Sequence, residues 1–319
     1  MKSTAVVLAV LIAAAVGQSR GEGQARRVYH LPGTIATVQL GGGLGAVSGG
    51  AGDAWVDDRW DERLVRLDRQ TGTVAARIPV DGRLALTAGA GALWALQSGG
   101  GYGRGLRGPL LRIDPATNGV VARIPLGALG FGVVPRGDSV WIWGPDELIR
   151  VDARTNRVAQ RIAVADGRGE TGGFALAGDQ PVITTADGHL VFFDPRTGAE
   201  ARAVRLPFVL PALQSASPRR AVVIAGGAVA AVDPRTGAVL WRTRLGFRVG
   251  SVVDAGGVLW AYGAYVRDPG DRVWKIDPQR GAILGSVLLP AFSTMGMAVI
   301  GGTIWVTTAG GRVLVLGSG

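Results

Sequence analysis

The sequence predicts an all-β protein, a seven-bladed β-propeller whose blades are four-stranded antiparallel sheets. Three observations predict this fold. A hairpin motif with an Asp turn recurs at intervals of about forty residues. A short apolar motif, often containing Trp, precedes each hairpin and occurs once more than the hairpin does. A segment near the start of the chain resembles the one strand that the last repeat lacks.

The hairpin motif is clearest at residues 229–245, VAAVDPRTGAVLWRTRL. Asp233 can accept hydrogen bonds from amides two and three residues on, Pro234 presets φ, and Gly237 supplies a positive φ. The flanking segments are rich in β-forming residues, which predicts two strands joined by this turn. The predicted structural turn residues of the six copies are Asp68, Asp114, Asp152, Asp194, Asp233 and Asp277.

The apolar motif follows a Gly in most copies, as in GALWAL at Gly91 and GGTIWVTT at Gly301. It occurs seven times, and the seventh copy leads into VLVLG at Val313, where the chain is about to end. The missing outer strand is expected from residues 33–40, GTIATVQL. Pairing this N-terminal strand with the C-terminal blade closes the ring and removes the open sheet edges.

We expect three segments: a signal peptide at residues 1–17, a linker at residues 18–27, and a single propeller domain at residues 28–319. Lys2 and the apolar run at residues 5–16 precede small residues at 15 and 17, which is the pattern of an exported protein. An uncleaved membrane anchor is the alternative, although twelve apolar residues are short for a bilayer span. The chain has no Cys, which excludes disulfides, thiolate metal sites and lipidation at Cys.

The formal net charge is +10, and 32 of the 34 basic residues are Arg. Such a surface predicts weak affinity for polyanions. However, Arg recurs at matching positions in the repeats, such as Arg66 and Arg112 before the Asp and Arg77 and Arg123 after it. This regularity predicts charge spread around the rim, and no specific nucleic-acid partner.

The connections between second and third strands are expected to share one face with the connections between blades. They are longest in blades one, two and six, at residues 57–63, 97–109 and 263–272. Because these blades cluster on one side of a closed ring, the loops predict one recognition surface that mixes aromatic and charged residues. Its candidate binding residues are Asp57, Asp58, Trp60, Asp61, Glu62, Tyr102, Arg104, Arg107, Tyr262, Tyr265, Arg267, Asp268 and Asp271. The alternative is that these loops vary in length and contact only water.

Catalytic and metal sites find little support. The carboxylates of DDRWDE could bind Ca²⁺, but the interleaved Arg59 and Arg63 favour a salt-bridged loop. The glycines 103, 105 and 108 join two strands and open no helix, so they make no dinucleotide site. His30 and His189 have no partner at ligand spacing. The central face offers Phe131, Glu170, Thr171, Arg248, Phe292 and Thr294, with no spacing that selects a pair. We therefore predict no catalytic residue, no cofactor and no metal.

The Trp-containing strand and the D-P-x-T-G-x-V-x-x-x-I pattern resemble the YncE-like, or YVTN-type, seven-bladed propellers. Residues 232–246, VDPRTGAVLWRTRLG, also resemble the PQQ-like repeats of outer-membrane assembly and quinoprotein propellers. The resemblance covers nearly everything after residue 27 and implies an exported ring that binds or scaffolds. Residues 302–307, GTIWVT, are similar to streptogramin lyases, but the catalytic His and Glu that this enzyme class uses with Mg²⁺ have no counterpart His here.

The expected function is that of an exported, non-catalytic binding or scaffold module at the cell envelope, in the periplasm or outside the cell. Its expected partner is an envelope protein, a peptide or a glycan, and the expected state is monomeric. The alternative is a small-molecule enzyme of the streptogramin-lyase type.

Overall fold

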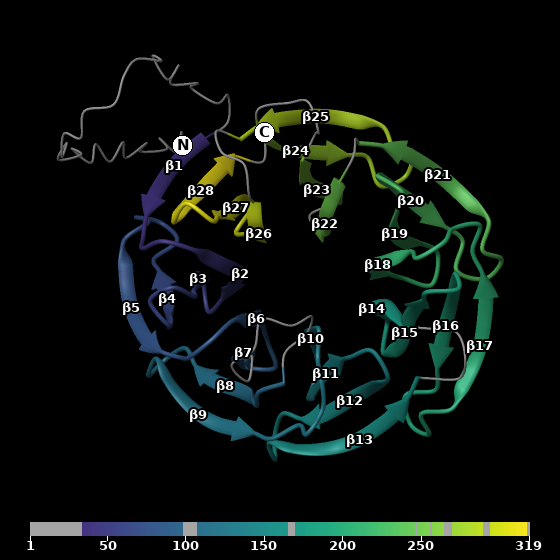
Figure 1. The fold of residues 1–319 in the computed structure, drawn as a ribbon, viewed down its shortest axis with the longest axis horizontal. Coiled ribbons are helices and arrows are strands. Elements are labelled where there is room, and N and C mark those ends of the chain that lie inside the picture. Colours follow the sequence, from purple (N-terminus) through teal and green to yellow (C-terminus); the bar gives the residue numbers. More distant parts are fainter. Residues whose placement is uncertain are drawn as a thin grey trace, which may run out of the picture.

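The computed structural model describes residues 34–97, 107–164, 170–245, 248–255, 257–264, 270–289 and 294–317. Seven four-stranded antiparallel sheets stand around a central axis and form a seven-bladed β-propeller (Figure 1). Within these ranges all regular secondary structure is β-strand, as predicted. No helix in the described ranges is long and apolar enough to cross a bilayer.

Each blade runs from an inner strand at the axis to an outer strand at the rim. Blade 1 contains β2 (Leu44–Gly50), β3 (Asp53–Asp58), β4 (Arg63–Leu67) and β5 (Val74–Pro79). Blade 2 contains β6 (Leu84–Gly89), β7 (Ala92–Gln97), β8 (Leu110–Asp114) and β9 (Gly119–Ile124). Blade 3 contains β10 (Gly132–Arg136), β11 (Ser139–Trp143), β12 (Glu147–Asp152) and β13 (Arg157–Ala163). Blade 4 contains β14 (Thr171–Ala177), β15 (Gln180–Thr185), β16 (His189–Phe193) and β17 (Glu200–Arg205). Blade 5 contains β18 (Ala212–Ala216), β19 (Ala221–Ala225), β20 (Ala228–Val232) and β21 (Val239–Arg244). Blade 6 contains β22 (Arg248–Ala255), β23 (Val258–Ala264), β24 (Asp271–Ile276) and β25 (Ile283–Leu288).

Blade 7 closes the ring from both ends of the chain. Its strands β26 (Thr294–Ile300), β27 (Thr303–Thr308) and β28 (Arg312–Gly317) are joined at the rim by β1 (Thr34–Gln39). Strand β1 pairs antiparallel with β28, with Val38 opposite Val313, and the Leu40 amide donates to the Gly311 carbonyl at 2.9 Å. The predicted closure by the N-terminal strand is confirmed.

The Asp turns have the predicted capping geometry. In blade 1, Asp68 Oδ1 accepts the amides of Gln70 and Thr71 at 2.9 and 2.8 Å, and Gly72 has a φ of +70°. Asn118 and Asn156 take the glycine position in blades 2 and 3 with φ values of 57° and 56°, which Asn tolerates better than most residues. The pKa values of Asp68, Asp152 and Asp194 are lowered, and the largest cause is the hydrogen bond from the backbone amide three residues after each Asp.

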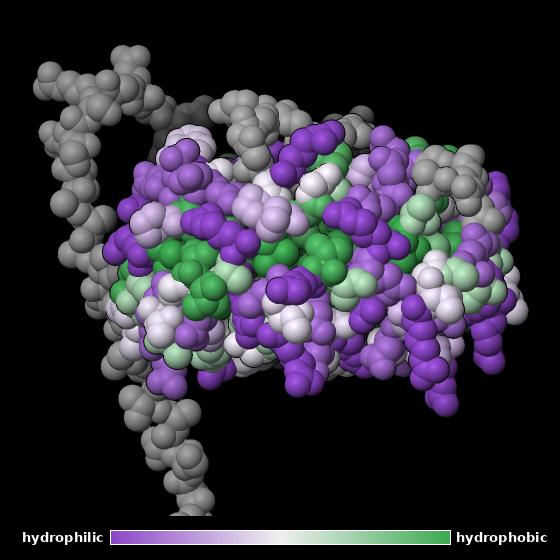
Figure 2. All heavy atoms as spheres, turned by 90° about the horizontal axis from the view of Figure 1, so that it is seen from below, coloured by the Kyte–Doolittle hydropathy of each residue, from purple (hydrophilic) through white to green (hydrophobic). Residues whose placement is uncertain are grey.

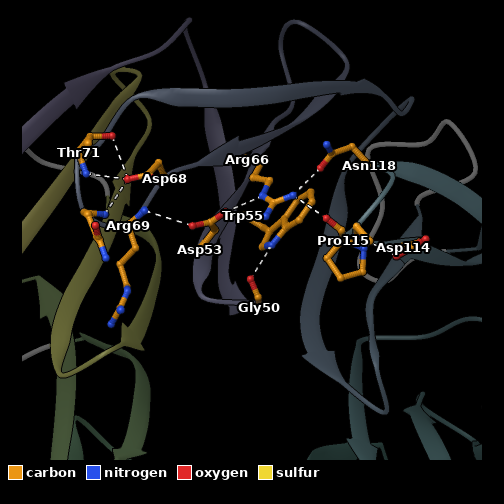
Figure 3. A network of polar contacts seen from close by, with 12 residues as sticks. Gly50, Asp53, Trp55, Arg66, Asp68, Arg69, Thr71, Asp114, Pro115 and Asn118 are labelled. Atoms are coloured by element: carbon orange, nitrogen blue, oxygen red, sulfur yellow. Dashed lines mark hydrogen bonds and ion pairs between the residues drawn. The ribbon is translucent and has the colours of Figure 1, made fainter.

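A Trp and an Arg on adjacent strands join neighbouring blades (Figure 3). Trp55 on β3 lies opposite Arg66 on β4, and the guanidinium lies 5.3 Å from the ring centroid. Arg66 then reaches the next blade, where it donates to Pro115 O at 2.5 Å and Asn118 Oδ1 at 2.9 Å. The pair thus stacks a cation on an aromatic face and caps the neighbouring turn.

The same arrangement recurs around the ring. Arg112 lies over Trp94 and donates to Ala153 O at 2.6 Å in the next blade. Blade 5 lacks the Trp on its second strand, and Trp241 on its rim strand instead donates to Pro278 O at 3.0 Å. Arg66 and Arg112, which precede the Asp turns of blades 1 and 2, are therefore half-buried clamps between blades. Their regular spacing predicted a position at the rim, which they do not occupy.

The outermost strands run along the circumference and follow one another head to tail (Figure 1). Each Asp turn lies against the end of the preceding rim strand: a Cβ on Gly237 would lie 2.2 Å from the Arg205 carbonyl, and one on Gly281 2.5 Å from Trp241 Cε3. Figure 2 views this rim over blades 1 to 3 and shows an apolar band flanked by hydrophilic side chains. Arg77 and Arg123 are exposed there, on β5 and β9.

Candidate functional site

The connections that carry the predicted binding residues lie on one face. In blade 1 the Val80 amide, which follows the rim strand, donates to the Glu62 carbonyl at 3.0 Å in the loop between β3 and β4. In blade 6 the Leu289 amide donates in the same way to the Asp271 carbonyl at 2.7 Å. Loops between second and third strands therefore share a face with the connections between blades, as the sequence predicts.

We call residues 59–62 the Trp60 loop. The sequence predicts that Asp57 and Asp58 belong to the loop that begins at residue 57, but the structure places them at the end of β3. Both belong to β3, opposite Leu64 and Arg63 of β4, and are only 1% and 0% exposed. Strand pairing continues farther than the charge pattern suggested, because each carboxylate finds partners inside the protein.

Arg63 holds the base of the Trp60 loop. Its Nε donates to Asp58 Oδ2 at 3.0 Å, and its Nη2 pairs with Asp61. Asp58 Oδ1 and Arg59 Nε are buried without a hydrogen-bond partner in the described part of the chain. No group of three or more His, Cys, Asp or Glu residues within it could hold a metal ion.

Trp60 at the tip of this loop is 73% exposed although its ring lies against the backbone. A Cβ on Gly42 would lie 2.2 Å from Trp60 Cε3, and one on Gly43 2.2 Å from Nε1, so the ring needs glycines beneath it. The Gly43 amide donates to the Ala309 carbonyl of blade 7 at 3.1 Å. Trp60 therefore presents one face to solvent from a position on the connection that closes the ring.

Asp57 lies under the loop and joins blade 1 to blade 2. Its Oδ2 accepts the Leu84 amide at 3.3 Å and lies 3.7 Å from Arg59 Nε. Burial raises the pKa of Asp57 to about 6, against the opposing effects of the Leu84 amide and of Arg59 and Arg83. The negative charge at neutral pH is thus maintained at a cost in stability.

This cost predicts a pH effect for Asp57→Asn. The folded-state pKa of about 6 lies above the ordinary value of 3.8, so the native state binds the proton more tightly than the unfolded state does. The free energy of unfolding contributed by Asp57 therefore falls as pH rises from about 4 to about 6, by about 2–3 kcal/mol. Urea unfolding of both proteins from pH 4 to pH 7 should show the wild type losing stability relative to Asp57→Asn, whose amide oxygen can still accept from Leu84. A constant difference between the two proteins across this range would contradict the prediction.

The other predicted binding residues divide into exposed and structural ones. Trp60, Asp61, Glu62 and Arg107 are exposed. Asp271 is buried, and its carboxylate accepts the Thr294 amide of blade 7. Tyr262 is half-buried against Gly250 and packs on the core cluster between blades 6 and 7. Residues outside the described ranges are Tyr102, Arg104, Tyr265, Arg267 and Asp268.

The central-face candidates make structural contacts where the structure describes them. Thr171 Oγ1 donates to the Pro145 carbonyl of blade 3 at 3.1 Å. Phe131 packs edge-on against Trp143, with ring centroids 5.1 Å apart. Glu170 is exposed, and its carbonyl accepts the Ala186 amide. Phe292 and the side chain of Arg248 lie outside what the structure describes.

His189 begins β16, as expected from the preceding turn, and His30 lies outside the described residues. His189 Nδ1 is 2.8 Å from Asp187 Oδ2, and the same carboxylate accepts the Thr185 hydroxyl at 2.5 Å. Burial acts to raise the pKa of Asp187, but these two hydrogen bonds outweigh it and leave the pKa lowered. The arrangement ties the turn between β15 and β16 together.

Sequence reasoning missed an apolar groove at the rim between blades 4 and 5. It has a volume of about 540 Å³ and is lined by residues 205–209 and 236–239. Val209 and Leu210 beside it are 77% and 68% exposed. The available signal was the pair of adjacent apolar residues that follows the Asp turn in blades 5 and 6.

Comparison with known proteins adds a partial family match. The model of a family described as outer membrane protein assembly factor BamB matches residues 211–319. No curated protein matches this chain.

Two solved structures share the architecture. A chain from the crystal structure of a mitotic checkpoint complex superposes with a TM-score of 0.67 at 12% identity, covering 96% of this chain and 98% of the other. BamB from Moraxella catarrhalis superposes with a TM-score of 0.57 at 15% identity, covering 91% of this chain and 98% of the other. Identities this low concern the fold alone.

Proposed function

We propose that the protein is an exported, non-catalytic binding module that captures an envelope protein through the Trp60 loop. The observation that carries the proposal is the environment of Trp60, which is 73% exposed while its ring packs against the backbone of the glycines at 42 and 43. Arg63 pairs with Asp58 and Asp61 on either side of it, and the glycines at 42 and 43 support the ring. A large aromatic side chain that is already ordered loses little entropy on binding, which favours it as the centre of an interface.

Charged groups surround this aromatic on the same loop. Asp61 and Glu62 are exposed beside Trp60, while Arg59 is half-buried. An apolar centre with a polar rim is the usual composition of a protein-binding surface. A peptide or a glycan ring stacked on Trp60 would use the same exposed face, so the test includes both.

Two observations support the proposal that the protein is exported to the cell envelope. The BamB family model over residues 211–319 carries the description of an outer membrane assembly factor. The apolar run at residues 5–16 has the length of a signal peptide and is shorter than a membrane span. Together they favour an envelope protein as the partner.

The test is crosslinking capture from the native envelope with the wild type and Trp60→Ala. Loss of a buried aromatic contact at an interface costs about 2 kcal/mol or more, so capture should fall about thirtyfold. Val121→Ala is the matched control, because Val121 is 55% exposed on β9, away from the loop. Protease treatment of the envelope before capture should abolish the signal, whereas glycosidase treatment should leave it.

Equal capture by wild type and Trp60→Ala would remove the Trp60 loop as the binding surface. A signal that survives protease and is lost after glycosidase would replace the protein partner by a glycan.

A further inference from the structure

The rim of blades 4 to 6 exposes more large apolar side chains than the rest of the described surface. Of nine such residues, six lie between positions 209 and 284, and on no other stretch of the described rim are they adjacent in pairs. We call these six the apolar rim: Val209, Leu210, Val239, Leu240, Ile283 and Leu284.

The fold itself does not require large residues there. In each of blades 1 to 6 the rim strand has a bulge just after the Asp turn, and one residue has no partner on the neighbouring strand. That residue is alanine in blades 1, 3 and 4, at positions 75, 159 and 201. In blades 5 and 6 it is Leu240 and Leu284, which are 52% and 55% exposed. Because alanine occupies the bulge position in three other blades, folding does not require a leucine at positions 240 and 284.

The backbone beside these leucines is available for pairing. Within the described part of the chain, strands β21 and β25 are the outermost strands of their sheets, and each pairs on one side only, with β20 and β24. Strand β25, ILGSVL, has no charged residue, whereas β5, β9, β13, β17 and β21 each contain Arg. Charged residues on edge strands usually prevent unwanted pairing, and β25 is without this protection.

The charge of the surroundings selects the kind of partner. Arg242 and Arg244 are exposed on β21, which has no acidic residue, and Arg205 lines the groove beside Val209 and Val239. The carboxylate in the turn that precedes β21, Asp233, accepts the Arg235 amide at 2.8 Å. A second copy of this chain would bring the same arginines against one another, and each copy has a net charge of +10.

From this geometry we infer that the apolar rim is a second docking surface, separate from the Trp60 loop, for an extended peptide segment of a partner that alternates apolar and acidic residues. The segment adds as a strand to the edge of β25 or β21. Its apolar side chains cover Leu240 and Leu284, and its carboxylates face Arg242 and Arg244. Main-chain hydrogen bonds supply affinity in this mode of recognition, and alternate side chains supply specificity.

The experiment measures fluorescence anisotropy of a short labelled peptide that alternates valine and glutamate. The full chain should bind it, and raising the salt concentration should weaken binding. The double variant Leu240→Ala/Leu284→Ala should bind at least about tenfold more weakly, and its melting temperature should be unchanged within about 2 °C, since alanine occupies the same bulge in three other blades. Val121→Ala, at the equivalent bulge position of blade 2, is the matched control and should bind like the wild type.

Two further peptides separate the contributions of charge and of apolar contact. A peptide alternating valine and lysine, and polyglutamate without valine, should both bind at least about tenfold more weakly than the first peptide. Equal binding of polyglutamate would overturn the proposal, because charge alone would then explain affinity. Equal binding by the double leucine variant would overturn it as well. Light scattering that shows a dimer in the wild type but not in the double variant would assign the apolar rim to self-association and would refute the partner.

Discussion

Deleting residues 28–40 should lower the melting temperature by on the order of 10 °C. This segment contains β1, which pairs with β28 over five residues, from Thr34 opposite Leu316 to Gln39 opposite Arg312. Its loss removes about five inter-strand hydrogen bonds, each worth about 1 kcal/mol net. Val38 and Leu40, which pack on the core cluster between blades 7 and 1, are lost with it. A domain of this size loses roughly 2 °C for each kcal/mol.

A deletion of residues 1–27 is the control for this experiment, because it removes the preceding segment and leaves β1 in place. Both truncated proteins should be compared with the full chain by thermal circular dichroism. The protein without residues 1–27 should melt like the full chain. If the protein without residues 28–40 does so too, pairing of β1 with β28 contributes nothing to the stability of the ring.

The ring closure and the Asp turns were predictable because each depends on local chemistry that repeats. An Asp that accepts the amide two residues on, followed by Gly or Asn at positive φ, makes the same turn in every copy. A repeat that lacks one strand at the C-terminus and finds it at the N-terminus has only one closed arrangement. The Trp and Arg clamp was visible as a pattern, but the direction in which Arg66 reaches was not.

The candidate site was predictable in position and much less so in its residues. The burial of Asp57 depends on the Leu84 amide of the next blade, which no pattern within residues 57–63 contains. The apolar rim depends on rim strands meeting head to tail, which brings Val209 and Val239 to one groove although thirty positions separate them. Contacts between blades depend on the twist of the sheets, and this twist cannot be derived from the sequence of any single repeat.

The second large effect is expected for Trp94→Ala, which removes the tryptophan of a clamp between blades and should lower the free energy of unfolding. Trp94 is 0% exposed, its Nε1 donates to the Gly89 carbonyl at 3.0 Å, and Arg112 lies 5.5 Å from its ring centroid. The substitution leaves a cavity in the cluster between blades 2 and 3, and we expect it to lower the free energy of unfolding by about 3–5 kcal/mol in urea titrations.

Trp60→Ala makes the same chemical change at a residue that is 73% exposed, and is the control. Since it creates no cavity, its cost should be below about 1 kcal/mol. The contrast separates the two uses of tryptophan in this chain: one kind is fixed beneath an Arg and holds the blades together, while the other is supported on glycines and left open to a partner. Equal losses from the two substitutions would mean that Trp60 belongs to the core of the ring, and the proposal that it binds an envelope protein would lose its main support.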